Sequence, residues 1–225
     1  MKTIMITGAG TGLGKELALA FSQQGFHLLL MGRTVSSLDS VKLDIEKNGG
    51  HADTLTLDLR NFGDINRKVL LIGHNYSIYG LVNNAGIGHF GPFSEMNDAE
   101  ILEMIETNVL GTIFMTKAVL PLLNHQDVGR IINIISTAGL RGKVDESVYC
   151  ASKFALRGFT ESLQKEYAAT NIHFQAVYMG GMNTPFWDGS NHVHDPSRFR
   201  SASEVAEIIL AHPDENEIII ESKKS

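Results

Sequence analysis

The sequence has a single cysteine, Cys150, in 225 residues, so no disulfide can form within the chain. This usage is typical of proteins kept in a reducing compartment. No apolar run approaches the roughly 20 residues that a membrane-spanning helix needs. Met1 is followed almost at once by an apolar, β-branched stretch, which leaves no room for a signal peptide. We therefore expect a cytoplasmic protein that does not associate with membranes.

Positive charge is also scarce. The formal net charge is −6 at pH 7, whereas domains that bind nucleic acid carry a basic surface. We therefore expect no nucleic-acid partner. Internal repeats, charge runs and low-complexity linkers are absent as well, and a hydrophobic content of 43% over this length allows one compact core. These features predict a single domain over residues 1–225.

Signals for a metal or a reactive thiol are weak. His192 and His194 are close in sequence, but two histidines alone rarely hold a metal ion, so we interpret them as surface residues and expect no metal. Cys150 is interpreted as a small side chain on a buried helix. Its position beside Tyr149 would also suit a redox group.

Short apolar stretches alternate with amphipathic ones along the chain, a pattern typical of parallel strands joined by helices. The predicted strands cover residues 3–7, 27–31, 53–57, 80–83, 130–135, 173–178 and 217–220. The predicted helices cover residues 13–24, 35–48, 61–73, 98–123, 148–168 and 202–211. We therefore predict the α/β class, with a doubly wound parallel sheet of about seven strands and helices on both faces.

A glycine-rich turn joins the first predicted strand to the first predicted helix. Gly8, Gly12 and Gly14 lie in this turn. In turns of this kind one glycine permits a tight bend, one lets the backbone approach a pyrophosphate, and one lets the helix pack closely on the sheet. Free N–H groups and the positive end of the helix dipole then meet the phosphates. The strand–turn–helix context predicts a dinucleotide site.

Three polar residues near the middle of the chain suggest a reaction. Tyr149 and Lys153 are four residues apart, so they share one face of a helix, and Ser136 precedes the tyrosine by thirteen positions. A free phenol has a pKa of about 10. A cation roughly 5 Å away would lower that pKa by on the order of two units at an effective dielectric constant of about 20. Taken alone, the trio is as consistent with a structural role as with catalysis.

Five motifs follow one another in a characteristic order. They are TGAGTGLG, NNAG at Asn83–Gly86, Asn108 in TNVLGT, Ser136, and YCASK, which contains Tyr149 and Lys153. From about residue 3 into the 180s, the chain resembles the short-chain dehydrogenase/reductase family. The resemblance implies a Rossmann-type fold, a nicotinamide cofactor, and hydride transfer to or from a carbonyl carbon. It also implies an oxidoreductase that acts on CH–OH or C=O groups.

The resemblance assigns a role to each of the four catalytic positions. Tyr149 exchanges a proton with the substrate oxygen, and Ser136 hydrogen-bonds that oxygen. Lys153 lowers the pKa of the phenol and bonds the nicotinamide ribose. Asn108 lies in a kinked helix whose carbonyl holds a water that links Lys153 to solvent. All four residue types are intact, which argues against the alternative of a catalytically silent NADP-binding regulatory protein.

Cofactor choice depends on the corner after the second predicted strand. Gly32 and Arg33 occupy it, and no carboxylate follows until Asp39. An arginine can bind the 2′-phosphate of NADP, so we expect NADP(H) rather than NAD(H). Thr11 stands where many NADP-binding relatives carry a second basic residue. Asp58 matches the position that bonds the adenine amino group, although it could instead cap the next helix.

The expected cofactor contacts come from five strand ends and two catalytic residues. They are Thr7, Gly8, Gly10, Thr11, Gly12, Leu13, Gly14, Arg33, Asp58, Leu59, Asn84, Ala85, Gly86, Tyr149, Lys153, Gly180 and Thr184. Thr184 keeps the position that contacts the carboxamide in the family. Met179-Gly180 replaces the usual Pro-Gly, so the loop after the sixth strand is expected to be less restrained.

A short substrate lid is expected at about residues 183–199. The candidate substrate contacts are His89, Leu140, Val144, Phe186 and Trp187. For Phe186 and Trp187, core packing is an equal alternative. In the family, the helices that match residues 98–123 and 148–168 form the main dimer interface, which predicts a homodimer, although both helices could simply cover the sheet.

Overall fold

The computed structural model describes residues 1–123 and 128–222. A seven-stranded sheet crosses the domain in the order β3-β2-β1-β4-β5-β6-β9. Every pairing within it is parallel. The strands are β1 (Lys2–Thr7), β2 (His27–Gly32), β3 (His51–Thr56), β4 (Ser77–Asn83), β5 (Gly129–Ile134), β6 (Ile172–Met179) and β9 (Glu217–Ile220). The predicted doubly wound α/β fold is therefore confirmed.

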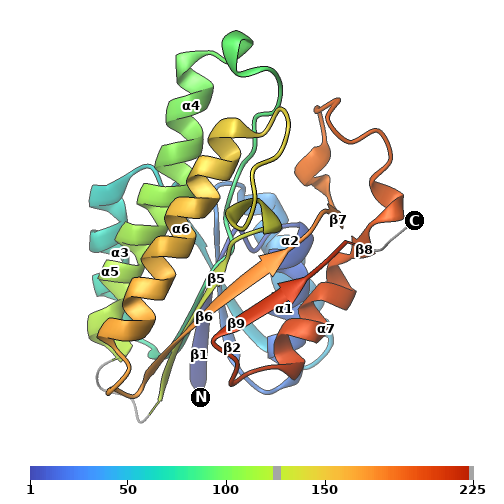
Figure 1. Ribbon diagram of the computed structural model, residues 1–225. Coiled ribbons are helices and arrows are strands. Elements are labelled where there is room, and N and C mark those ends of the chain that lie inside the picture. Colours follow the sequence, from blue (N-terminus) through green and yellow to red (C-terminus); the bar gives the residue numbers. More distant parts are fainter. Residues whose placement is uncertain (124–127, 223–225) are drawn as a thin grey trace.

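Helices cover both faces of the sheet (Figure 1). One layer holds α1 (Gly12–Gln23), α2 (Val35–Lys47) and α7 (Ala202–Ala211). The other holds α3 (Phe62–Gly73), α4 (Asp98–Met104), α5 (Thr112–Leu123) and α6 (Ser147–Glu166). Among the described residues, no helix is long and apolar enough to cross a bilayer.

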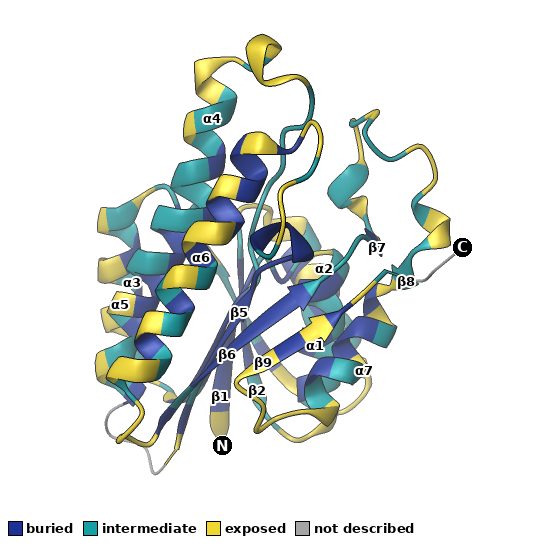
Figure 2. Cartoon of the chain, in the orientation of Figure 1, coloured by how far each residue is buried: buried dark blue, intermediate teal, exposed yellow. Residues whose placement is uncertain are grey.

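Both faces of β2 are apolar, so helices pack against the sheet from both sides. Its residues alternate between the faces of the sheet. Leu28 and Leu30 pack in the hydrophobic cluster under α1 and α2, whereas Leu29 and Met31 pack in the cluster under α3 and α5. All four are buried, and the dark strands between the helices in Figure 2 show the same burial along the sheet. A continuous apolar run is what a strand covered on both faces requires.

Helical structure runs over residues 98–123 as predicted, but its middle is not α-helical. A π-helix, η2 (Ile105–Gly111), separates α4 from α5. Wider turns of this kind occur most often at functional sites. Asn108 lies inside the π-helix and is fully buried. Two short strands, β7 (Met182–Asn183) and β8 (Arg200–Ser201), were also not predicted; they pair in parallel at the base of the lid.

Buried asparagines join the central strands to the α5 and α6 layer. Asn83 Nδ2 donates to Asn133 Oδ1 and to Thr116 Oγ1, both at 2.9 Å. Asn133 Nδ2 donates to Thr160 Oγ1 at 2.9 Å. Asn83 thus braces β4 against β5 and α5. This network fixes the end of the sheet from which the functional loops leave.

The substitution Asn133→Ala is expected to lower the free energy of unfolding by about 2–3 kcal/mol, because it leaves buried polar partners unpaired. Urea denaturation would measure the loss. Asn75→Ala removes an exposed asparagine and should change stability by less than about 0.5 kcal/mol. Equal effects of the two substitutions would contradict the structural role given to the buried network.

Candidate functional site

The functional residues gather at the carboxyl edge of the sheet. Strands β1 and β4 are neighbours, while the chain winds outward in both directions from them. In such sheets ligands bind in the crevice at this switch point. A cavity of about 620 Å³ lies there, within the usual range for ligand pockets. Nineteen of the predicted site residues line it: Thr7, Gly8, Thr11, Gly12, Leu13, Arg33, Asp58, Leu59, Asn84, Ala85, Gly86, His89, Ser136, Tyr149, Lys153, Gly180, Thr184, Phe186 and Trp187.

The glycine turn has the backbone that its sequence requires. Gly8 and Gly12 adopt positive φ values of 65° and 53°, which favour glycine. A side chain on Gly14 would meet the Gly8 carbonyl oxygen at 2.2 Å, so the helix could not approach this closely with any other residue. No side chain caps the first turn of α1, and that turn carries no acidic residue. Its N–H groups are therefore available to an anion.

Two predicted cofactor contacts, Gly10 and Gly14, do not line the cavity. A side chain built on Gly10 would meet Ser37 Oγ at 2.5 Å, so this glycine permits close packing against α2. Gly14 packs against the turn itself. Neither lines the cavity, and both serve the shape of the turn. On the cavity side, Asn84 Nδ2 donates to the carbonyl oxygens of Thr7 and Gly8 at 3.0 and 3.2 Å, which ties the β4 loop to the turn.

The trio predicted from the sequence is assembled and buried. Tyr149 and Lys153 lie on the first turns of α6, with Lys153 Nζ 5.6 Å from the centre of the phenol ring. Ser136, at the end of β5, hydrogen-bonds the Tyr149 side chain. The exposed fractions are 5% for Ser136, 6% for Tyr149 and 4% for Lys153. Lys153 Nζ also donates to the Ile134 carbonyl oxygen at 3.2 Å.

Burial changes the electrostatics expected for this trio. It raises the pKa of Tyr149 above its ordinary value; the Ser136 hydrogen bond opposes the rise, and the Glu146 charge adds to it. Burial also lowers the pKa of Lys153 to about 8. The pKa of Tyr149 is therefore shifted in the direction opposite to the lowering expected from Lys153, because that expectation left out desolvation. Tyr149 is a neutral phenol at neutral pH, the form that can donate a proton.

Lys153 should make stability depend on pH. Its folded pKa of about 8 lies below the ordinary 10.5, so the unfolded chain binds more protons between these values. Its contribution to stability is complete above the unfolded pKa and is lost as the pH falls through the folded pKa. From pH 7.5 to 10, the free energy of unfolding of the wild type minus that of Lys153→Met should rise by on the order of 2 kcal/mol. A flat difference in chemical denaturation would show that Lys153 titrates normally.

Asn108 lies outside the cavity and hydrogen-bonds two of the segments that form it. Its Oδ1 accepts from the Ile87 N–H at 2.9 Å, and its Nδ2 donates to the Ile87 carbonyl oxygen at 2.9 Å and to Ser152 Oγ at 3.1 Å. A side chain on Gly86 would lie 3.3 Å from Asn108 Oδ1 and 3.6 Å from Lys153 Nζ. Asn108 thus joins the π-helix, the β4 loop and α6 without lining the cavity. The water expected at its backbone carbonyl stays a prediction.

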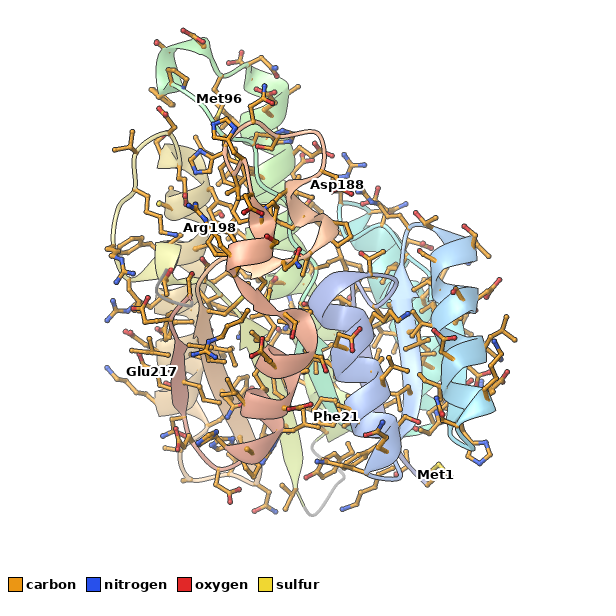
Figure 3. All side chains as sticks on the ribbon, turned by 90° about the vertical axis from the view of Figure 1, so that its right-hand side faces the viewer. Met1, Phe21, Met96, Asp188, Arg198 and Glu217 are labelled. Carbon is orange, nitrogen blue, oxygen red and sulfur yellow. The ribbon has the colours of Figure 1, made fainter. Side chains whose placement is uncertain are left out.

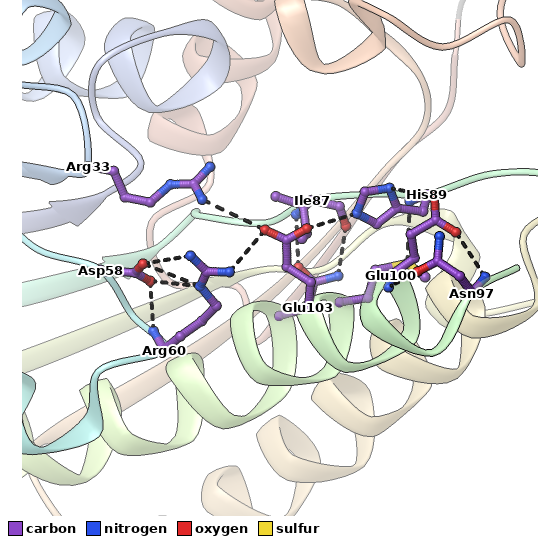
Figure 4. A network of polar contacts seen from close by, with 10 residues as sticks. Arg33, Asp58, Arg60, Ile87, His89, Asn97, Glu100 and Glu103 are labelled. Atoms are coloured by element: carbon purple, nitrogen blue, oxygen red, sulfur yellow. Dashed lines mark hydrogen bonds and ion pairs between the residues drawn. The ribbon is translucent and has the colours of Figure 1, made fainter.

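A polar network borders the cavity beside Arg33 and Asp58 (Figure 4). Arg60 donates to Asp58 Oδ2 at 2.8 Å and to Glu103 Oε1 at 3.2 Å. Arg33 is half-exposed, and its Nη1 lies 3.9 Å from the same Glu103 oxygen. Hydrogen bonds from Arg60 lower the pKa of Asp58. His89 Nε2 lies 3.0 Å from Glu103 Oε2, so Glu103 connects this corner to the predicted substrate residues.

Glu103 was missed by the sequence analysis. It lies on α4, far along the chain from Arg33, and no local motif marks it. The alternative role of Asp58 as a helix cap is wrong, because Asn61 caps α3 by accepting from the Asp64 N–H at 3.1 Å. Asp58 is therefore available at the cavity.

Aromatic side chains from the lid and from the loop after β4 surround Tyr149. Phe90 meets the Tyr149 ring edge-on at 5.4 Å, and Phe186 lies 6.0 Å from it. Trp187 stacks on Phe90 at 5.5 Å. Phe186 and Trp187 thus pack with other rings and also line the cavity, and their contact with a substrate stays a prediction. Figure 3 shows the lid residues Asp188 and Arg198 at the end of the molecule that holds Met96, away from Met1.

Two predicted substrate residues do not reach the cavity. Leu140 packs with Ile135, Leu156 and Tyr178 behind the site, and the Val144 side chain is 83% exposed. Within the predicted pocket segment 140–144, Lys143 does line the cavity, and so does Glu146, which the sequence analysis missed. The loop turns after Leu140, so that Lys143 and Glu146 face the cavity. No short-range sequence pattern predicts which side chains of this loop face inward.

The two lid histidines, His192 and His194, differ in burial. His194 is exposed as expected, but the surface interpretation of His192 was wrong: it is partly buried, and its Nε2 lies 3.0 Å from Glu146 Oε1. Across residues 1–123 and 128–222, no group of three or more His, Cys, Asp or Glu side chains is arranged to hold a metal ion. Burial raises the pKa of the Cys150 thiol, which fits its interpretation as a packing residue.

Comparisons with known proteins agree with this geometry. The family described as short chain dehydrogenase matches residues 2–194. A sepiapterin reductase of Chlorobaculum tepidum is 34% identical over 82% of this chain and 79% of its own length. An NADP-dependent 3-hydroxy acid dehydrogenase of Schizosaccharomyces pombe is 33% identical over 93% and 85%.

Solved structures give the same result. A short chain dehydrogenase from Escherichia coli CFT073 complexed with NADPH superposes with a TM-score of 0.89 at 27% identity, covering 98% of this chain and 95% of that one. An actinorhodin polyketide ketoreductase variant with NADPH gives a TM-score of 0.87 at 29% identity, with the same coverage. The chain therefore belongs to the short-chain dehydrogenase/reductase family of oxidoreductases.

Proposed function

We propose that this protein is an NADP(H)-dependent oxidoreductase that interconverts a carbonyl compound and a secondary alcohol, with Tyr149 as the general acid and base. One observation carries the proposal: a buried Ser136–Tyr149–Lys153 trio shares a cavity with an uncapped glycine turn. The turn suits a pyrophosphate, and the trio suits a reacting oxygen. Relatives with reductase names and solved structures that hold NADPH support the same reading.

The residues present fit a nicotinamide dinucleotide. The turn at Gly8–Gly12 would hold the pyrophosphate, and Asn84–Gly86 would face the adenosine ribose. Lys153 would bond the nicotinamide ribose, and Thr184 would meet the carboxamide. Thr184 already lies against the turn, since a side chain on Gly12 would come within 3.4 Å of its Cβ. When bound, the nicotinamide supplies or accepts the hydride at the substrate carbon.

We propose NADP(H) because Arg33 lines the cavity, and its guanidinium would form charge-assisted hydrogen bonds with a 2′-phosphate. Asp58 would bond the adenine amino group. Glu103 lies beside Arg33 and would oppose the phosphate. Arg60 already neutralises much of this acidic charge by pairing with both Asp58 and Glu103.

In carbonyl reduction, the Tyr149 hydroxyl donates its proton to the substrate oxygen as negative charge develops there. Ser136 donates a hydrogen bond to the same oxygen and stabilises that charge. A cationic Lys153 then stabilises the phenolate that remains. The aromatic side chains of the lid exclude water from the reacting atoms. Burial keeps Tyr149 in the neutral phenol form, which is the protonation state that reduction requires.

We also propose a cytoplasmic homodimer formed through α4–α5 and α6. Exposed apolar side chains on these helices, Leu102 and Phe154, support that surface. The lone, buried Cys150 suits a reducing compartment.

The test is turnover of NADPH with a panel of ketones, aldehydes and diketones, including sepiapterin and ketoacyl esters, for which relatives are named. Loss of the near-ultraviolet absorbance of NADPH would report turnover. We expect reduction of at least one class of carbonyl compound. Tight NADPH binding with no turnover across the panel would contradict the proposal and favour a regulatory protein.

A further inference from the structure

A buried carboxylate borders the substrate end of the cavity, and the proposed mechanism does not use it. Glu146 lies three residues before Tyr149, directly ahead of α6, and is 6% exposed. A buried carboxylate is costly unless it is paired. Its partners are His192 Nε2 at 3.0 Å and Lys143 Nζ at 3.6 Å. Lys143 belongs to the same loop, but His192 comes from the lid.

His192 is fixed on two sides. Its edge meets Glu146, and its ring stacks on Phe90 at 4.7 Å with 17° between the planes. Phe90 in turn meets Tyr149 edge-on and stacks with Trp187. The histidine therefore anchors the lid to the same aromatic group that surrounds the reacting phenol.

Other polar side-chain contacts of the lid stay local. Trp187 Nε1 donates to the Met182 carbonyl oxygen at 2.9 Å, within the adjoining β7. Ser190 and Asp195 bond residues two positions away. Within the part of the chain that the structure describes, the His192–Glu146 contact is the one polar side-chain contact by which residues 183–199 reach beyond β7 and β8.

We propose that His192 and Glu146 are positioning residues that latch the lid over the substrate pocket. Their contact holds Phe186 against Tyr149 and Trp187 against Phe90, and so gives the pocket its apolar wall. This inference rests on the proposed function for its catalytic consequence, while the latch itself can be measured without turnover. Losing a hydrogen bond of this kind shifts the ratio of closed to open lid by about tenfold.

Trp187 makes the latch observable, because it is the single tryptophan of the chain and lies in the lid. The variants are Glu146→Ala, which removes the acceptor, and His192→Phe, which keeps a ring for Phe90 but loses the hydrogen bond. Glu146→Gln keeps an acceptor oxygen. His194→Ala changes an exposed histidine of the same lid and is the matched control.

We expect quenching of Trp187 fluorescence by acrylamide to increase about two- to threefold in Glu146→Ala and in His192→Phe, because an open lid exposes the indole. Glu146→Gln and His194→Ala should stay near the wild type. The double variant Glu146→Ala/His192→Phe should add little to either single one, since both remove the same contact. With a reduced carbonyl substrate, KM should rise about five- to tenfold while kcat changes less than about twofold, because the substrate must then close the lid.

Unchanged quenching in both Glu146→Ala and His192→Phe, or effects that add fully in the double variant, would overturn the latch. Circular dichroism would confirm that each variant is folded, and if Glu146→Ala does not fold, the contrast between His192→Phe and His194→Ala decides the question. A protein with the expected quenching pattern and no turnover would keep the latch and refute the proposed function. Turnover in the wild type, with no change of Trp187 quenching in the variants, would support the proposed function and refute the latch.

Discussion

Replacing Tyr149 by phenylalanine is expected to lower kcat/KM for carbonyl reduction by about 10³-fold, the scale of a lost general acid. The substitution removes one hydroxyl from a fully enclosed position and keeps the ring that packs against Phe90 and Phe186. NADPH binding should change little, because the glycine turn, Arg33 and Lys153 are untouched. Steady-state kinetics and cofactor titration would separate the two effects.

Tyr79→Phe is the matched control. Tyr79 stacks on Phe26 at 5.3 Å and does not line the cavity, so the loss of its hydroxyl should leave kcat/KM within about twofold of the wild type. A Tyr149→Phe variant with wild-type turnover would show that another group transfers the proton. Ser136 would then be the next candidate, because it hydrogen-bonds the same phenol.

Arg33→Ala is expected to raise the Kd for NADPH by about 10- to 100-fold, the range of a charge-assisted hydrogen bond to phosphate. The Kd for NADH should rise by less than about threefold, since that cofactor has no 2′-phosphate. Fluorescence titration of the reduced cofactors would measure both constants. The ratio of the two Kd values is the quantity that tests the role of Arg33.

Arg67→Ala serves as the control for net charge. Arg67 is an exposed arginine on α3 that pairs with Asp64, so its loss should affect the two cofactors alike and weakly. Equal losses of NADPH and NADH affinity in Arg33→Ala would mean that Arg33 does not read the 2′-phosphate. The nearby Glu103 carboxylate would then dominate this corner.

Local patterns in the sequence were sufficient for the fold, and together with the family resemblance they pointed to the centre of the site. The run around Leu28–Met31 is buried on both sides, as a central parallel strand must be. The glycine turn was predictable because Gly8, Gly12 and Gly14 meet steric demands that few other residues satisfy. The helical repeat placed Tyr149 and Lys153 on one face of a helix, and the resemblance to the family assigned them a catalytic role.

What the sequence analysis missed depends on contacts between distant segments. Glu103 and Glu146 reach the cavity only because α4 and the loop before α6 fold over the strand ends. His192 looked like a surface residue because its partner is 46 positions away. The resemblance implied a kinked helix at Asn108, but the hydrophobic pattern could not show that the irregularity is a π-helix, since a single wide turn leaves no periodic mark.

The raised pKa of Tyr149 was missed for a related reason. The sequence reveals the nearby charge of Lys153 but not the degree of burial, and burial decides the sign here.

The most direct test of hydride transfer at this site is isotopic. NADPH that carries deuterium on the transferred position of the nicotinamide would be incubated with a carbonyl substrate found in the panel, and the alcohol product analysed by mass spectrometry. The account predicts one deuterium on the carbinol carbon of the product in the wild type, and loss of product formation in Tyr149→Phe. An alcohol product without deuterium would contradict it, because the hydrogen would then have come from another source.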